Sequence, residues 1–172
     1  AGMREAINYS VASEESLRAV GAWTDAALAL SNPMNDDQRY LRTSLRSSVL
    51  QTVADNRRTL GRVGLRMFEL GRVFLPNPSH GDDNLPDERE TLVAALSGRR
   101  SPQSWQKAEG PNEMGFYDAK GLAEDLLGRL GIEPTFEPAT DPALRPGRTA
   151  GIMANGERLG TVGEVGADVL EM

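Results

Sequence analysis

Apolar positions recur along this chain with two different periods, and each period predicts one kind of element. Where apolar side chains recur at every second residue, or form a short unbroken run, the pattern is typical of a β-strand. Strands are therefore predicted over residues 5–13, 27–34, 65–75, 89–98 and 135–140, and a hairpin over residues 148–165. Where they recur at every third or fourth residue, the pattern is typical of a helix. Helices are predicted over residues 13–21, 43–61 and 116–131, and a last one begins after residue 166.

The first two predicted elements follow directly from this pattern. In the first strand, Ile7, Tyr9 and Val11 share one face. The short helix that follows has Ser13 as its N-cap residue and two glutamates in its first turn, and it ends at Gly21.

The second predicted helix begins at Thr43 or Ser44 and ends at Gly61. Its apolar arc consists of Leu45, Val49, Val53 and Leu60. Arg46 and Arg57 lie on the shoulder of this arc, where a guanidinium is expected to be partly buried and to reach a partner.

The stretch LRMFELGRVFL, residues 65–75, predicts a central strand because it is apolar on both faces. Glu69 interrupts it. A buried carboxylate needs a cationic partner that also donates hydrogen bonds, and the nearest candidates are Arg42 and Arg46. We therefore interpret Glu69 as one half of a structural ion pair that fixes helix to sheet, in preference to a substrate contact.

The second half of the chain predicts a helix and a hairpin of more regular pattern. The helix over residues 116–131 has Gly131 at its C-terminal end, and its inner face is predicted to consist of Leu122, Leu126, Leu127 and Leu130. Asn155-Gly156 marks the turn of the hairpin. The order of the elements predicts an α+β domain with a largely antiparallel sheet and helices packed on it.

Composition limits the class of protein. The 172 residues fit one domain, and 39% hydrophobic with 26% charged residues is typical of a soluble globular protein. No run of about 18 apolar residues occurs, so no membrane span is expected. No signal peptide is visible at the N-terminus. The absence of cysteine excludes disulfides and thiolate metal sites and fits a cytoplasmic protein.

Charge is unevenly distributed. Residues 39–72 contain eight arginines against Asp55 and Glu69, a net charge of +6, although the whole chain carries −6. Such a basic stretch on an acidic body indicates either an oriented contact with an acidic surface or a phosphate, or internal pairing with the acidic remainder.

Few residues offer catalytic or metal chemistry. His80 is the single histidine and lies beside Asp82 and Asp83 in a polar loop, where we interpret it as a bystander and not as a metal ligand. Neither a P-loop nor a dinucleotide-binding glycine motif occurs. Aromatic residues make up only 5%, a poor match to a base-stacking platform. We therefore predict no catalytic, cofactor-binding or metal-ligating residue.

Five segments, in order across almost the whole chain, resemble the core of the bacterial phenylalanyl-tRNA synthetase beta subunit. They read EAINYS, NPM…YLRTSL, FELGRVF, DAKGLAEDLL and PGRTAGIMANGERLGTVGEV, and LRTSL and FELGRVF at their separation are the most specific. The chain departs from the family at Arg46-Ser47-Ser48, at Arg145 and at Gly166-Ala167, where the family usually has Leu-Pro-Gly, His and His-Pro.

The resemblance implies a class II aminoacyl-tRNA synthetase-like fold, an antiparallel sheet flanked by helices. It implies that residues 1–172 are a single catalytic-like core domain, a fragment of a longer chain. In that family the domain pairs with the catalytic alpha subunit in an (αβ)₂ heterotetramer in the cytoplasm. The holoenzyme uses ATP and Mg to join phenylalanine to tRNA. The fragment itself is expected to hold no cofactor.

Two positions indicate lost chemistry. In active class II modules the strand resembling FELGRVF continues into Arg-x-Glu/Asp, whose arginine holds the ATP α-phosphate. Here Leu75 and Asn77 stand in those places, so the isolated chain is expected to be inactive and is not expected to be a self-standing ATP-using enzyme. The leading hypothesis is an assembly module of phenylalanine–tRNA ligase. Its subunit-interface candidates are Arg42, Arg46, Arg57 and Arg72. The alternative is an RNA-binding module that uses residues 39–72.

Overall fold

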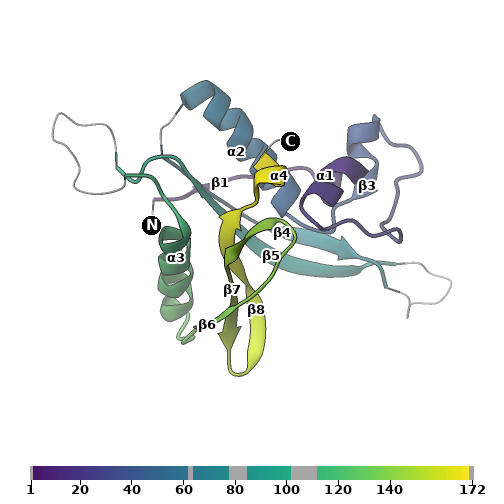
Figure 1. The fold of residues 1–172 in the computed structure, drawn as a ribbon. Helices are drawn as coiled ribbons and strands as arrows, with labels where there is room; N and C mark the ends of the chain where they lie inside the picture. The colour runs from purple at the N-terminus through teal and green to yellow at the C-terminus, as the bar shows by residue number, and fades with distance from the viewer. Residues whose placement is uncertain (1, 62–63, 78–84, 102–111, 171–172) are drawn as a thin grey trace.

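The longest pairing in the computed structural model joins two eleven-residue strands, β4 (Leu65–Leu75) and β5 (Asp87–Ser97), which run antiparallel over their whole length. β1 (Arg4–Glu5) lies along the other edge of β4 and runs parallel with it, so β4 is the central strand of this sheet. The structure describes residues 2–61, 64–77, 85–101 and 112–170 (Figure 1).

Two smaller sheets complete the strands of the described residues. One pairs β2 (Val11–Ala12) with β3 (Tyr40–Leu41), antiparallel. The other has the antiparallel order β6 (Thr135–Pro138), β7 (Leu144–Ala154) and β8 (Glu157–Val165). The helical segments are α1 (Glu14–Ala19), a 3-10 turn (Asp36–Gln38), α2 (Arg46–Leu60), α3 (Phe116–Arg129) and α4 (Ala167–Leu170). The predicted α+β class with mainly antiparallel sheets is confirmed.

Helix α2 takes part in both hydrophobic clusters found among the described residues. In Figure 1 it lies above the β4–β5 hairpin, whereas α3 and the β6–β8 sheet lie below the hairpin. One cluster joins α2 to β4 and β5 through Val49, Val53, Leu65, Met67, Val93 and Ala95. The other joins α2 to α1, β8 and α4 through Val20, Ala22, Leu50, Ala143, Val165 and Val169. Each fully buried valine, leucine or methionine side chain stabilises the fold by about 1.5–3 kcal/mol. Among the described residues, no helix has both the length and the apolar composition needed to cross a membrane.

Several predicted elements are confirmed with their local causes. Ser13 caps α1, where its hydroxyl oxygen accepts a hydrogen bond from the Ser16 N–H at 3.0 Å. Helix α2 ends at Gly61, which has φ of +67°. The β7–β8 turn places Asn155 and Gly156 at φ of +51° and +80°, the left-handed pair that a tight hairpin requires.

Other predictions were wrong, most clearly in the first forty residues. The strand expected over residues 5–13 is two two-residue strands, β1 and β2, with an irregular segment between them. Residues 27–34 form no strand. Their pairing is a single bridge between Ala29 and Tyr40, because the neighbouring strand β3 is only two residues long.

Two helices are less completely buried than their sequence patterns predicted. Helix α2 begins at Arg46, and the Ser44 hydroxyl accepts the Arg46 N–H. Its last apolar residue, Leu60, is exposed because α2 reaches beyond the cluster that buries Val49 and Val53. In α3, Leu126 and Leu130 are also exposed, since the helix rests on β8 and β5 with only part of its apolar arc.

Candidate functional site

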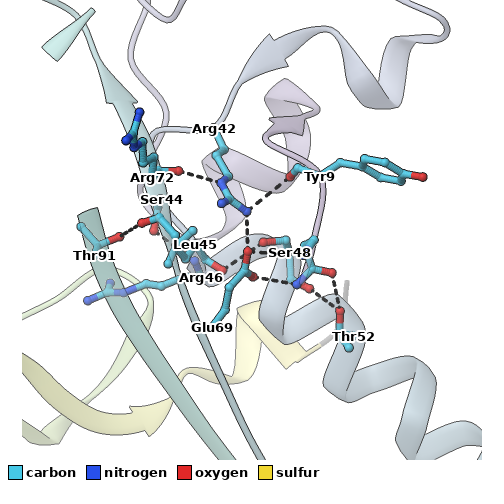
Figure 2. A network of polar contacts seen from close by, with 12 residues as sticks. Tyr9, Arg42, Ser44, Leu45, Arg46, Ser48, Thr52, Glu69, Arg72 and Thr91 are labelled. Atoms are coloured by element: carbon cyan, nitrogen blue, oxygen red, sulfur yellow. Dashed lines mark hydrogen bonds and ion pairs between the residues drawn. The ribbon is translucent and has the colours of Figure 1, made fainter. Parts of the chain in front are cut away.

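The most deeply buried charged pair in the described residues lies between β4 and the chain that leads into α2. Glu69 is 2% exposed and Arg42 is 4% exposed. The Arg42 Nη1 donates to Glu69 Oε1 at 2.6 Å, and the Arg42 Nε donates to the Arg72 carbonyl at 2.9 Å (Figure 2). The Nη1 also donates to the Tyr9 carbonyl at 3.4 Å. Sequence reasoning identified the need for this partner because a lone carboxylate in an apolar strand is strongly disfavoured.

The second carboxylate oxygen of Glu69 holds the segment between β1 and β2. The Asn8 side-chain amide donates to Glu69 Oε2 at 2.7 Å. Thr52 of α2 lies against that amide: its hydroxyl is 2.9 Å from Asn8 Oδ1 and equally 2.9 Å from the Ser48 carbonyl, so its proton is shared between them (Figure 2 shows Thr52 beside the network). The network therefore links three separate parts of the chain through one carboxylate. A fully satisfied buried network of this kind rigidifies what it connects.

Gly71 makes room for the guanidinium. A Cβ at this position would lie 2.6 Å from Arg42 Nη2, which is closer than real Cβ atoms approach other heavy atoms. The glycine of the FELG stretch is therefore explained by packing: Gly71 has no side chain, and this lets Arg42 lie against β4.

The segment held by the network presents two large apolar side chains to solvent. Ala6 donates its N–H to the Phe68 carbonyl at 2.7 Å, and the Ser10 carbonyl accepts the Arg42 N–H at 3.0 Å. Ile7 and Tyr9, which alternate with the attached Asn8, are 88% and 79% exposed. We call residues 6–10 the docking segment. The sequence pattern placed Ile7 and Tyr9 on one face without indicating which side is covered, and in the structure both face solvent.

The arginines of the basic stretch mostly have carboxylate partners within the chain. Arg46 pairs with Asp141 at 2.9 Å, Arg58 with Asp55 at 2.9 Å and Arg72 with Glu88 at 2.9 Å. Arg57 donates to the neutral Ser97 hydroxyl at 3.0 Å. Internal pairing thus accounts for much of the charge in residues 39–72.

The four interface candidates therefore occupy different environments. Arg42 is buried and offers almost no surface. Arg46 is half-buried, and its carboxylate partner Asp141 is largely covered. Arg57 and Arg72 are exposed. The structure brings Arg42 and Arg72 together through the Arg72 carbonyl and leaves the other two apart from them.

A second charge cluster lies at the start of α3. The Arg100 guanidinium donates two hydrogen bonds to Asp118, at 2.7 and 2.8 Å, and the Gly115 N–H donates to the same carboxylate at 2.8 Å. The hydrogen bonds from Arg100, helped by that from Gly115, lower the pKa of Asp118 to about 2. This pair closes the connection between β5 and α3 and serves as an N-terminal cap of the helix.

Leu75 and Asn77, which stand where active class II modules have a phosphate-binding arginine and a carboxylate, lie at the end of β4. Leu75 is the last residue of that strand and pairs with Asp87 of β5, and Asn77 follows two residues later. His80 lies outside the described residues. Within the part of the chain that is described, no three metal-ligating side chains come together.

Comparison with known proteins identifies the family of this chain. A family model described as the phenylalanyl tRNA synthetase beta chain CLM domain matches residues 1–172. The chain belongs to this family.

Individual relatives agree with the family. A phenylalanine–tRNA ligase beta subunit from Dehalococcoides mccartyi is 40% identical over 167 residues, which cover 95% of this chain and 20% of the relative. Beta subunits from Latilactobacillus sakei and Listeria innocua are 35% and 31% identical over 172 and 167 residues, again 20% of each relative. The chain thus spans about a fifth of the length of the relatives it matches. The resemblance inferred from LRTSL and FELGRVF is confirmed.

Proposed function

We propose that this chain is the catalytic-like core domain of a phenylalanine–tRNA ligase beta subunit, and that it acts as a non-catalytic assembly module that pairs with the alpha subunit. The relatives are named as beta subunits, and a beta subunit implies a differently built partner. In this proposal residues 1–172 form one domain of class II synthetase-like fold. The long antiparallel β4–β5 hairpin with α2 packed on it supports that fold.

The docking segment is the observation that carries the proposal. Isolated exposed apolar residues are ordinary on protein surfaces. Here two large ones, Ile7 and Tyr9, lie two positions apart on a segment whose other side is fixed by a buried network. Tyrosine in a rigid setting is characteristic of interface hot spots, and covering an isoleucine contributes about 1.5–3 kcal/mol. The occupant we propose for this face is the alpha subunit.

Catalysis belongs to the partner in this proposal. Leu75 cannot bind a phosphate and Asn77 cannot supply a carboxylate, so ATP, Mg and phenylalanine bind in the alpha subunit. The (αβ)₂ holoenzyme, in the cytoplasm, then charges tRNA. Arg57 and Arg72, which are exposed, remain proposed contact residues, whereas Arg42 and Arg46 are engaged in ion pairs inside this chain. Because carboxylates already neutralise much of residues 39–72, the RNA-binding alternative has less support.

The test compares holoenzymes that differ only in the beta subunit. Replacing Ile7 and Tyr9 with serine is expected to raise the subunit dissociation constant at least about tenfold, since truncated hot spots cost about 2 kcal/mol or more. The matched control is Met34→Ser, because Met34 is 91% exposed but lies outside the docking segment. Sedimentation over a dilution series measures the dissociation constant. Aminoacylation should fall with assembly and recover when alpha subunit is added in excess. Unchanged assembly in the double serine variant contradicts the proposal.

A further inference from the structure

We propose that Glu69 is the positioning residue of the docking segment: through Asn8 and Arg42 it holds residues 6–10 in one conformation, with Ile7 and Tyr9 outward, and so sets the affinity for the partner. This inference rests on the function proposed above, because it assigns a cause to the shape of that surface. Glu69 itself lies in the interior and touches no partner.

The attachments of the segment all lie on its inward side. The Asn8 amide reaches Glu69 Oε2 at 2.7 Å, and the Asn8 N–H lies 3.4 Å from Oε1. Arg42, which is held by Glu69 Oε1, donates from its side chain to the Tyr9 carbonyl and from its backbone to the Ser10 carbonyl. Glu69 thus contacts Asn8 directly and acts on the Tyr9 carbonyl through the Arg42 guanidinium, whereas the Ser10 carbonyl is held by the Arg42 backbone.

This control matters because the segment has no strand ladder of its own. Backbone hydrogen bonds hold the segment at Ala6 and at Ser10, but residues 7–9 between them lie outside the regular sheets, so their conformation depends on these side-chain bonds. Free residues lose conformational entropy when they are ordered for binding, and a surface that is already ordered avoids that loss at the moment of association. The buried network therefore raises affinity without contacting the partner.

Thr52 adds a second level of positioning. Its hydroxyl lies 2.9 Å from both Asn8 Oδ1 and the Ser48 carbonyl, so its one proton is shared between these two acceptors, and the bond to Asn8 forms only if the amide oxygen faces α2. This orientation turns the Asn8 NH₂ toward Glu69. Replacing Thr52 with valine removes the hydroxyl and keeps the branched shape, so the Asn8 amide loses its orientation while the Arg42–Glu69 pair stays intact.

The central variant is Glu69→Gln. A glutamine amide has one oxygen and one NH₂ group, so it accepts from Asn8 or from Arg42 but points a donor at the other. Its matched control is Asp141→Asn, which damages the Arg46 pair without touching residues 6–10. Each variant is placed in the full beta subunit, assembled with alpha, and studied at a temperature where circular dichroism shows it folded.

The decisive measurement is a double-variant cycle on the assembly constant. In the natural background we expect Glu69→Gln and Thr52→Val to weaken assembly about fivefold or more, and Asp141→Asn to change it less than about twofold. In a background that already carries Ile7→Ser and Tyr9→Ser, Glu69→Gln should have almost no further effect. A structural role alone would give equal factors in both backgrounds, and that result overturns the inference.

The outcomes separate this inference from the proposed function. If the serine variants assemble normally, both proposals are overturned. If the serine variants are weak but Glu69→Gln and Thr52→Val assemble normally, only the positioning role is overturned. Should Glu69→Gln fail to fold, Thr52→Val in the same two backgrounds decides the question, because it leaves the ion pair in place.

Discussion

Removing the carboxylate of Glu69 breaks the most deeply buried ion pair among the described residues. In Glu69→Ala, the Arg42 guanidinium stays in the interior, where it keeps only two neutral carbonyl partners, those of Arg72 and Tyr9. The Asn8 amide loses its acceptor as well. The variant thus leaves a buried charge without compensation.

The size of the effect follows from that arrangement. Breaking a buried ion pair by removing one partner costs about 3–5 kcal/mol. Two carbonyls still solvate Arg42, so we expect the lower end, about 3 kcal/mol, of a total stability that is typically about 5–15 kcal/mol. With a urea dependence of about 2 kcal/mol per molar, the unfolding midpoint should fall by about 1.5 M.

Urea unfolding of the 172-residue chain, followed by circular dichroism, measures this loss. A loss below about 0.5 kcal/mol is the range of surface substitutions and would refute the burial argument. The control is the double variant Glu69→Ala with Arg42→Met. It should recover most of the stability, because replacing both members of a buried pair by apolar residues is often neutral. Equal instability of the single and double variants would mean that a cavity, and not an unpaired charge, causes the loss.

Three further predictions use other parts of the structure. The chain by itself should bind neither ATP–Mg nor phenylalanine, and a saturable one-to-one heat in calorimetry at millimolar ligand would contradict this. Asp118 has a folded pKa lowered to about 2 by its hydrogen bonds with Arg100, so the stability it contributes is present above its unfolded pKa of about 4 and is lost as the pH falls toward 2. Asp118→Asn should therefore flatten the pH dependence of unfolding between about pH 4 and 2, and an unchanged slope there would exclude this pair as its source. Gly71→Ala should cost about 1–3 kcal/mol, because its Cβ meets Arg42 at 2.6 Å. Its control, Gly128→Ala in α3, has no atom within 4 Å of the new Cβ and should stabilise by up to about 1 kcal/mol, so similar losses in both would contradict the contact argument.

Sequence reasoning succeeded where one physical requirement had one solution. The run at residues 65–75 is apolar on both faces and becomes the central strand, and a glutamate inside it requires a cation nearby. Asn155-Gly156 has few alternatives to a tight hairpin turn. These features depend on residues close in sequence or on a strong local energetic demand.

Sequence reasoning failed where the burial of a residue depended on which distant part of the chain packs against it. The alternation at residues 5–13 correctly separates two faces but does not say which one is covered. The covered side holds the small Ala6 and the hydrogen-bonded Asn8, and the large Ile7 and Tyr9 face outward. The signal was present in Asn8, since a polar residue among apolar ones indicates either solvent or a specific internal partner, and only the fold distinguishes them.

The ion pairs of Arg42 and Arg46 differ in how much of the chain must be synthesised before they can form. Arg42 and Glu69 are 27 residues apart, whereas Arg46 and Asp141 are 95 residues apart. During synthesis on a ribosome, the first pair can form once β4 has emerged, long before Asp141 is made. Arg46 must wait for nearly the whole domain, with its charge held in water until then. Contacts of short separation form faster because less loop entropy is lost. We therefore expect the amino-terminal half to fold first and the β6–β8 sheet to pack onto it last. Ribosome-bound chains truncated before residue 141 should already protect β4 from proteolysis.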